Sequence, residues 1–245
     1  MRATVVIPTF NEAENLPRLV KEIRTAVPGI RILVVDDASP DGTADLADAL
    51  GRDLGGIDVL RRRTKDGLGA AYRAGLRRAI DDGAEICIQM DADLSHPPEV
   101  LPALIAIVEH GADLAIGSRY VPGGRTVDWP WQRRALSRWG NRYSSGVLGL
   151  AINDATAGYR AYSAAALERM DFESVHASGY GFQVEMTYRL VNAGGKIVEF
   201  PITFHDRQAG ESKMSGGIIK EALGLVLKLR ADYWRQRHER RKSGG

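Results

Sequence analysis

Two aspartates, Asp91 and Asp93, stand two residues apart directly after the apolar run of residues 85–90. That run is typical of a buried strand, so both carboxylates are expected at the end of a strand. Carboxylate oxygens bind hard divalent cations, and such a cation can bridge a diphosphate and neutralise the charge on a leaving nucleotide. Aspartates are also common in turns, so the pair by itself predicts either a cation site or a turn.

The elements that would position these carboxylates alternate between strand and helix. Strands are predicted over residues 4–7, 31–35, 57–60, 85–90 and 113–117, and helices over residues 12–26, 41–52, 67–80 and 98–109. This alternation is typical of an α/β fold with a doubly wound, mostly parallel sheet and helices on both faces. Ligands bind such sheets at the carboxyl ends of the strands. One crevice is therefore expected to gather the polar residues that follow strand ends, namely Asn11, Asp36, Asp37, Lys65, Asp91, Asp93, Ser118 and Arg119.

The second half of the chain is less regular. Loops are predicted over residues 120–135 and 206–217, helices over 135–150 and 179–193, and a strand over 196–201. A final helix with one apolar stripe is predicted from Ile218 to about Arg237, and it runs into a basic tail that ends at Lys242. These patterns predict one continuous domain over residues 1–217 and a C-terminal amphipathic helix with a basic tail over residues 218–245.

Composition excludes several classes of protein. The length of 245 residues fits one large α/β domain, and a net charge of +2 is too small for bulk nucleic-acid binding. A single cysteine, Cys87, excludes an internal disulfide and a cysteine zinc cluster, and its apolar neighbours predict a buried thiol. No signal peptide is visible, and no apolar run reaches the roughly 18 residues needed to span a bilayer. We therefore expect a cytoplasmic protein.

Several motifs resemble those of known enzymes. The segments VVIPTFNE (5–12), VVDDASPDGT (34–43), DADLSHPP (91–98) and IGSRY (116–120) have the order and spacing of family 2 glycosyltransferases. The segments GLGAAYRAG (67–75), WPWQRRALS (129–137), DATAGYRAY (154–162), GYGFQVE (179–185) and GESKMSG (210–216) resemble those of dolichol- or polyprenol-phosphate mannosyltransferases. The resemblance extends from Val5 to about Leu227.

The resemblance implies a GT-A fold, with a nucleotide-sugar half over about residues 1–119 and an acceptor half over about residues 120–217. It implies GDP-mannose as donor, polyprenyl phosphate as acceptor, Mg²⁺ or Mn²⁺ as cofactor, and inversion at the anomeric carbon. Several relatives have glutamine, a metal ligand in some of them, where this chain has Ser95.

The same resemblance assigns roles to individual residues. It places the nucleotide sugar against Pro8, Phe10, Glu12, Val35, Asp37, Asp91, Ala92, Asp93, Arg207 and Lys213. It places the metal on Asp91 and Asp93, and the acceptor phosphate on Arg119, Arg133 and Ser137. The implied catalytic residues are Asp93, Arg119, Arg133 and Lys213.

Elementary chemistry makes these roles reasonable. A lipid phosphate monoester is largely dianionic at neutral pH, since its second pKa is about 6, so it needs positioning more than a strong general base. Arginine forks suit phosphate, while a cation and Lys213 can stabilise the charge that develops on the β-phosphate of the donor. The competing interpretation of Arg119, Arg133 and Arg207 is an ordinary solvated surface charge.

Several further residues allow two interpretations each. Asp36 either orients its loop or touches ligand, and Gly67 with Gly69 either presents N–H groups to phosphate or makes a tight packing turn. His96 is either a turn residue or a base, and Trp129 and Trp131 either contact the isoprenoid or membrane or pack in the core. Gln183 and Glu185 are candidates to reach the sugar or acceptor, with a buried hydrogen-bonded carboxylate as the alternative for Glu185, and Asp154 with Arg160 is a candidate structural pair.

Two different functions also remain open from the sequence. One is a polyprenyl phosphate glucosyltransferase that uses UDP-glucose, and the other is a non-catalytic GT-A module that binds donor or partner. A nucleotidyltransferase is disfavoured, because no glycine-rich loop follows the first predicted strand.

The lipid acceptor implies a place on the membrane. We expect a peripheral position on the cytoplasmic face, reached through residues 218–242, whose tail is basic and would attract an anionic surface. A second possibility is that this helix only packs on the domain and a separate integral membrane protein anchors the enzyme.

Overall fold

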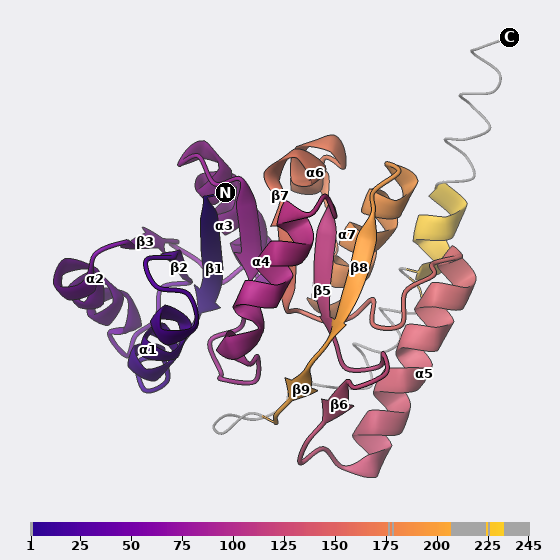
Figure 1. The fold of residues 1–245 in the computed structure, drawn as a ribbon, viewed down its shortest axis with the longest axis horizontal. Coiled ribbons are helices and arrows are strands. Elements are labelled where there is room, and N and C mark those ends of the chain that lie inside the picture. Colours follow the sequence, from indigo (N-terminus) through magenta and orange to yellow (C-terminus); the bar gives the residue numbers. More distant parts are fainter. Residues whose placement is uncertain (1, 176, 178, 207–223, 225, 233–245) are drawn as a thin grey trace, which may run out of the picture.

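The computed structural model describes residues 2–175, 177, 179–206, 224 and 226–232, and its centre is a seven-stranded sheet (Figure 1). The strand order is β3 (Ile57–Arg61), β2 (Arg31–Asp36), β1 (Ala3–Thr9), β4 (Ile86–Gln89), β7 (Arg160–Ser163), β5 (Leu114–Ser118) and β8 (Ile197–Pro201). All neighbours pair in parallel except β7, which is antiparallel to both β4 and β5. A second, two-stranded parallel sheet joins β6 (Arg125–Thr126) to β9 (Thr203–Phe204).

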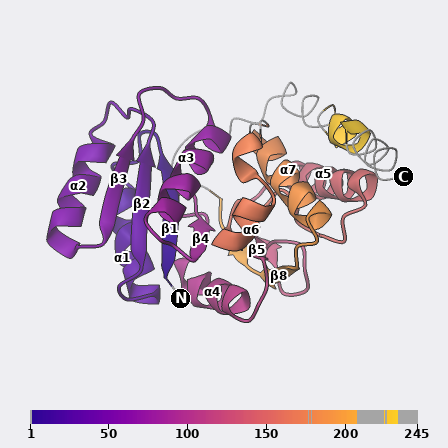
Figure 2. The same cartoon turned by 90° about the horizontal axis from the view of Figure 1, so that it is seen from above.

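Helices cover both faces of the large sheet, as the view from above shows (Figure 2). The helices α1 (Leu16–Ala26) and α4 (Leu101–Glu109) lie on one face, and α3 (Leu68–Asp81), α6 (Ala164–Arg169) and α7 (Gly179–Asn192) on the other. The helix α2 (Thr43–Leu54) packs beside β3, and α5 (Trp131–Leu148) lies at the β8 end of the molecule. Short 3₁₀ turns span Pro98–Val100 and Phe172–Ser174.

The alternation of side chains along β1 explains the two-faced core. Val5 and Ile7 pack toward α1 and α4, whereas Val6 packs toward α3 and α7. Successive side chains of a strand point to opposite faces, and a parallel strand covered on both faces is apolar on both. The run from Val5 to Ile7 is therefore fully buried. The predicted doubly wound α/β sheet is confirmed.

A third, smaller core joins α5, α7 and the C-terminal segment. Leu148 at the end of α5 packs with Val184 and Tyr188 of α7 and with Val226. Within the described residues, the segment 226–232 is thus a helix docked on the domain, while its Leu227 is 57% exposed.

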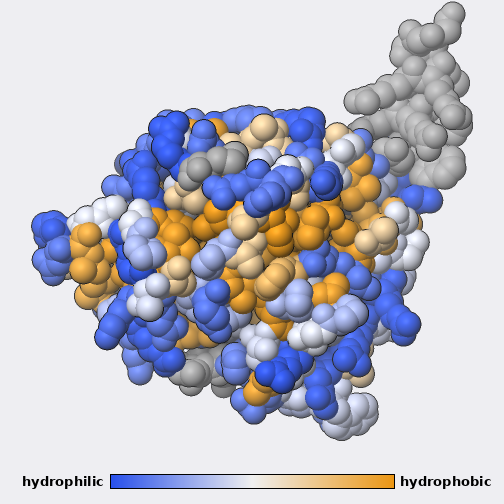
Figure 3. Space-filling view, in the orientation of Figure 1, coloured by the Kyte–Doolittle hydropathy of each residue, from blue (hydrophilic) through white to orange (hydrophobic). Residues whose placement is uncertain are grey.

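Apolar side chains also gather on the surface. On the face shown in Figure 3 they form a band over α4, β5 and β8, with polar side chains around it. None of the helices in the described part of the chain is long and apolar enough to cross a membrane.

The structure corrects the sequence prediction in the second half. The predicted loop over residues 120–135 contains β6 and the first turn of α5, which begins at Trp131 rather than at residue 135. The first turn of α5 consists of Trp131, Gln132, Arg133 and Arg134, so no apolar repeat marks it in the sequence. The strand β7 escapes prediction, because it has only four residues and includes a buried arginine. Of the predicted loop over residues 206–217, all but the first residue lies outside the described residues.

Candidate functional site

The two aspartates after β4 lie in a tight turn, and each carboxylate accepts hydrogen bonds from neighbouring groups. The hydroxyl of Tyr72 donates to Asp91 Oδ1 over 2.8 Å, and the backbone N–H of Asp91 donates to His96 Nδ1 over 3.1 Å. Asp93 Oδ1 accepts from the backbone N–H and the hydroxyl of Ser95, at 3.1 and 2.5 Å. The turn that the pair predicted is therefore present in the structure.

A glycine, Gly158, lies beside Asp91. Gly158 has no side chain, and a Cβ built there would lie 3.6 Å from Asp91 Oδ2 and 3.8 Å from His96 Nε2. The described residues hold no group of three or more His, Cys, Asp or Glu side chains that could bind a metal. Asp91 and Asp93 are hard oxygen ligands of the kind Mg²⁺ and Mn²⁺ take, and a cation there would complete its shell with phosphate or water oxygens.

Tyr72 is fully buried under this turn. Burial raises the pKa of its hydroxyl well above the usual value of 10, and the neighbouring charges of Asp91 and Asp93 raise it further. The hydroxyl therefore stays protonated and remains a donor to Asp91.

The loops after β1 and β2 form a second polar region. Asp36 accepts from the hydroxyls of Thr9 and Ser39, at 2.9 and 2.6 Å, so its carboxylate orients the loop. Asp37 forms an ion pair with Arg62 at 2.5 Å. Burial raises the pKa of Asp37, and the guanidinium of Arg62 opposes that shift. Arg62 was not among the predicted site residues, although it directly follows β3 and so is a polar residue after a strand end like the predicted ones.

The first loop also carries predicted donor contacts. The ammonium of Lys65 lies 3.3 Å from the ring centroid of Phe10, and the backbone N–H of Glu12 donates to the hydroxyl of Thr43. Pro8 lies in β1 beside Val35 of β2. The side chain of Val35 is buried in the core on the α3 face, and its backbone lies in the sheet between β1 and β3.

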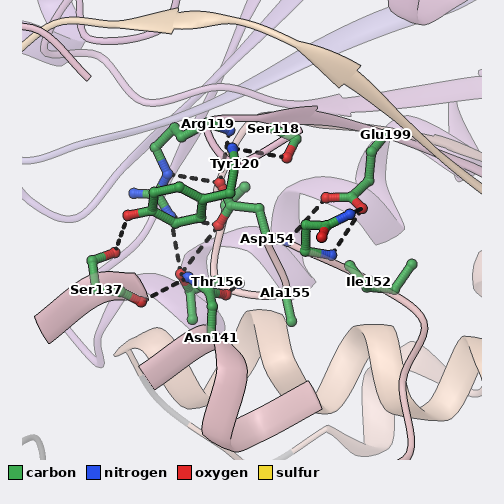
Figure 4. A network of polar contacts seen from close by, with 12 residues as sticks. Ser118, Arg119, Tyr120, Ser137, Asn141, Ile152, Asp154, Ala155, Thr156 and Glu199 are labelled. Atoms are coloured by element: carbon green, nitrogen blue, oxygen red, sulfur yellow. Dashed lines mark hydrogen bonds and ion pairs between the residues drawn. The ribbon is translucent and has the colours of Figure 1, made fainter. Parts of the chain in front are cut away.

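Arg119 lies in a buried polar network at the end of β5 (Figure 4). Its Nε and Nη2 atoms donate to the two oxygens of Asp154 over 2.8 and 2.6 Å, and its backbone N–H donates to the same carboxylate. Arg119 is 6% exposed and Asp154 is 0% exposed, so the interpretation of Arg119 as a solvated surface charge is wrong.

The expected pairing of Asp154 with Arg160 is also wrong. Arg160 donates instead to the backbone carbonyls of Ala155 and Ala157 and to the hydroxyls of Tyr162 and Thr187. Arg119 follows β5 whereas Arg160 begins β7, and of these two arginines Arg119 alone reaches the Asp154 carboxylate.

The network continues into α5. Nη2 of Arg119 donates to the hydroxyl of Thr156, and the side chain of Asn141 bonds both that hydroxyl and the backbone carbonyl of Ser137. The hydroxyl of Tyr120 donates to the hydroxyl of Ser137 over 2.7 Å, as Figure 4 shows. The structure thus brings Arg119 and Ser137 into one network.

Arg133 lies one helical turn before Ser137 on α5. Its guanidinium forms an ion pair with Asp206 at 2.7 Å and lies 4.0 Å from the ring centroid of Trp129. Trp129 is buried against Phe204 and so belongs to the core, whereas Trp131 is 67% exposed.

Contacts in α3 and α7 define the surroundings of three more residues. Gly69 packs against Phe182, so it belongs to a close helix contact. Glu185 pairs with Arg189 and accepts from the N–H of Ala177, so it is a structural carboxylate. Gln183 is buried, and its two amide atoms have no hydrogen-bond partner among the described residues.

The predicted donor contacts Arg207 and Lys213 lie outside the described residues.

Comparisons with known proteins show the family of the chain. The family model described as glycosyl transferase family 2 matches residues 4–171. The chain is 52% identical over 228 residues to the undecaprenyl-phosphate mannosyltransferase of Micrococcus luteus, covering 93% of each chain. It is 52% identical over 226 residues to the polyprenol monophosphomannose synthase of Mycolicibacterium smegmatis, covering 92% of this chain and 85% of the relative.

A solved structure supports the fold. Glucosyl-3-phosphoglycerate synthase from Mycobacterium tuberculosis, in complex with Mn²⁺, UDP-glucose and phosphoglyceric acid, superposes with a TM-score of 0.69 at 19% identity, over 94% of this chain and 79% of that one. This likeness confirms the predicted GT-A fold, and the two sequence relatives confirm the predicted resemblance to polyprenol-phosphate mannosyltransferases. The chain is a glycosyltransferase and belongs to glycosyl transferase family 2.

Proposed function

We propose that the enzyme transfers mannose from GDP-mannose to a polyprenyl phosphate, with inversion, and so makes polyprenyl phosphate mannose for later lipid-linked glycosylation. The observation that carries this proposal is the 52% identity, over 93% of the chain, to an undecaprenyl-phosphate mannosyltransferase. The aspartate pair at the end of β4 supports it, because a diphosphate donor needs a cation at that place.

On the donor side, Asp91 and Asp93 would hold Mg²⁺ or Mn²⁺. The cation would supply positive charge to the diphosphate as the nucleotide leaves. Tyr72 and Ser95 orient the two carboxylates through the hydrogen bonds described above. Asp37 and Phe10 would bound the nucleotide, while Lys213 and Arg207, which lie outside the described residues, would bind its phosphates.

On the acceptor side, the phosphate would bind where α5 meets the Arg119 network. Arg133 and Ser137 are four residues apart on one helix and so share a face. The guanidinium of Arg133 would exchange Asp206 for the lipid phosphate, which bears two negative charges and needs orientation more than deprotonation. Arg119, whose charge is balanced by Asp154 in a buried ion pair, would hold the network that includes Ser137 in place.

We further propose a peripheral position on the cytoplasmic face of the membrane, where the lipid acceptor lies. The outward side of α5 supports it: Trp131 and Trp139 are 67% and 50% exposed, and the exposed arginines on that helix are Arg134, Arg138 and Arg142. The helix contains no acidic residue. Tryptophan and arginine together suit an anionic lipid surface. The basic tail proposed for the same role lies outside the described residues, and a separate integral anchor protein is the competing explanation.

A donor panel tests the reaction. Full-length protein is incubated with polyprenyl phosphate, a divalent cation and radiolabelled GDP-mannose, UDP-glucose or UDP-GlcNAc, and the label that enters the organic phase is counted. Label from GDP-mannose alone is the expected result. Label from UDP-glucose instead would replace the proposal by a polyprenyl phosphate glucosyltransferase.

A further inference from the structure

The helix α3 approaches its neighbours more closely than side chains normally allow. A Cβ built on Gly75 would overlap Val6 Cγ1 and lie 2.7 Å from Val35 Cγ2, so this turn of α3 rests directly on β1 and β2. A Cβ built on Gly69 would lie 2.9 Å from Phe182 Cδ2, so the first turn rests directly on α7. The two glycines therefore fix both the height and the tilt of α3 over the sheet.

Tyr72 lies between these glycines, one helical turn from each, and faces the same way. Its ring is parallel to that of Phe182, with an interplanar angle of 8° and centroids 6.2 Å apart. The ring is therefore confined by the sheet on one side and by α7 on the other, and the place of its hydroxyl follows from the packing of α3.

The two oxygens of Asp91 face different surroundings. Oδ1 accepts from the Tyr72 hydroxyl over 2.8 Å. Oδ2 lies on the side of Gly158, where a Cβ would be in ordinary contact with it at 3.6 Å. A carboxylate with one oxygen held in this way cannot rotate freely, so the other oxygen keeps its direction.

We propose that Tyr72 is a positioning residue, which holds Oδ1 of Asp91 and thereby turns Oδ2 toward the cation. The segment GLGAAYRAG over residues 67–75 would then serve the site through close packing, by delivering this hydroxyl, rather than by binding phosphate at the helix N-terminus. This inference rests on the proposed cation at Asp91 and Asp93.

The test measures Mn²⁺ binding directly. Full-length protein with GDP is titrated with Mn²⁺, and free Mn²⁺ is measured by electron paramagnetic resonance. Loss of an outer-shell hydrogen bond typically weakens metal binding roughly 10- to 100-fold, so Tyr72→Phe is expected to raise the Kd for Mn²⁺ by that factor. Turnover of the variant is expected to recover as Mn²⁺ is raised, with kcat near that of the wild type.

Tyr162→Phe is the matched control. Tyr162 is also fully buried in the same core, and its hydroxyl accepts from Arg160 over 3.0 Å, away from Asp91. This variant is expected to lose similar stability in urea and to keep the Mn²⁺ affinity within about twofold of the wild type. An equal weakening in both variants would show a general effect of core damage and would overturn the proposal.

Failure of the inference is distinguishable from failure of the proposed function. If the wild type binds Mn²⁺ and Tyr72→Phe binds it equally well, Tyr72 has no positioning role and the cation site stands. If the wild type binds no Mn²⁺ with GDP or UDP, the cation site itself is wrong. If Tyr72→Phe does not fold, Phe182→Leu is tested in its place, because this change removes the ring against which Tyr72 packs. An unchanged Kd for Mn²⁺ in Phe182→Leu also overturns the proposal.

Discussion

At the scale of single residues, Asp91 and Asp93 share one turn but have different donors. The hydroxyl of Tyr72 donates a hydrogen bond to Asp91, and the hydroxyl of Ser95 donates one to Asp93. The side chain of Asp93 is largely buried. A carboxylate that already has its own hydrogen bonds is oriented before any ligand arrives, which lowers the cost of binding a cation.

Replacing Asp93 by alanine is expected to abolish transfer and preserve the fold. Charge neutralisation by a metal is worth several kcal/mol in a transition state, so the rate should fall by at least about 100-fold. Label transfer and circular dichroism measure the two effects. Full turnover of the wild type in excess EDTA would contradict the metal requirement.

Replacing Arg119 by alanine is expected to act mainly on stability. It would leave Asp154, which is 0% exposed, as a buried carboxylate without its bidentate partner. Breaking a buried ion pair on one side costs about 3–5 kcal/mol in the free energy of unfolding. Urea denaturation measures the loss, and a change below about 1 kcal/mol would show that Asp154 finds other donors.

Replacing Arg133 by alanine is expected to act on the acceptor. Its ion pair with Asp206 is part-exposed and contributes about 0–1 kcal/mol to stability. We expect a higher KM for polyprenyl phosphate or a lower kcat, with the affinity for GDP-mannose unchanged in calorimetry. Equal loss of donor affinity without acceptor would move Arg133 to the donor site.

At the scale of elements, α5 has two faces with separate roles. The inward face carries Arg133, Ser137 and Asn141 of the candidate acceptor site, and the outward face carries Trp131 and Trp139. A helix with these two faces would connect a lipid surface to the proposed acceptor site.

The outward face is expected to bind anionic vesicles. Each basic residue near such a surface contributes about 1 kcal/mol at low salt, so replacing Arg134, Arg138 and Arg142 by alanine should weaken binding by roughly 100-fold. Sedimentation with phosphatidylglycerol vesicles measures it, and added salt should weaken the wild type in the same direction.

Leu54→Ser is the matched control, because Leu54 is 55% exposed on α2, away from α5. If the triple variant binds as tightly as the wild type but truncation after Arg230 abolishes binding, the membrane contact belongs to the tail. If neither change matters, a separate anchor protein is favoured.

At the scale of the whole molecule, Cys87 reports on global unfolding. It lies in the core between the sheet and α3, and burial raises its pKa from 9.0 to about 12. The thiolate is the reactive form, so the folded protein at pH 8 should not react with Ellman's reagent. Reaction is expected only along the urea unfolding transition, and rapid labelling without denaturant would contradict the buried position.

The sequence by itself determined the elements of the first half and the edge of the sheet where the candidate site lies. Apolar runs such as Arg31–Asp36 and amphipathic repeats such as Leu16–Ala26 encode strand and helix locally, because each records which side of the element is buried. Parallel alternation then places Asp37 and Asp91 at the same edge of the sheet.

Only the tertiary structure decided which side chains meet. Arg119 pairs with Asp154 across 35 residues, and Tyr72 with Asp91 across 19 residues. No local pattern marks β7, since its place between β4 and β5 follows from pairing with two distant strands. Contacts of this kind depend on how elements pack, and packing is settled by the shape of the whole core rather than by the periodicity of any one segment.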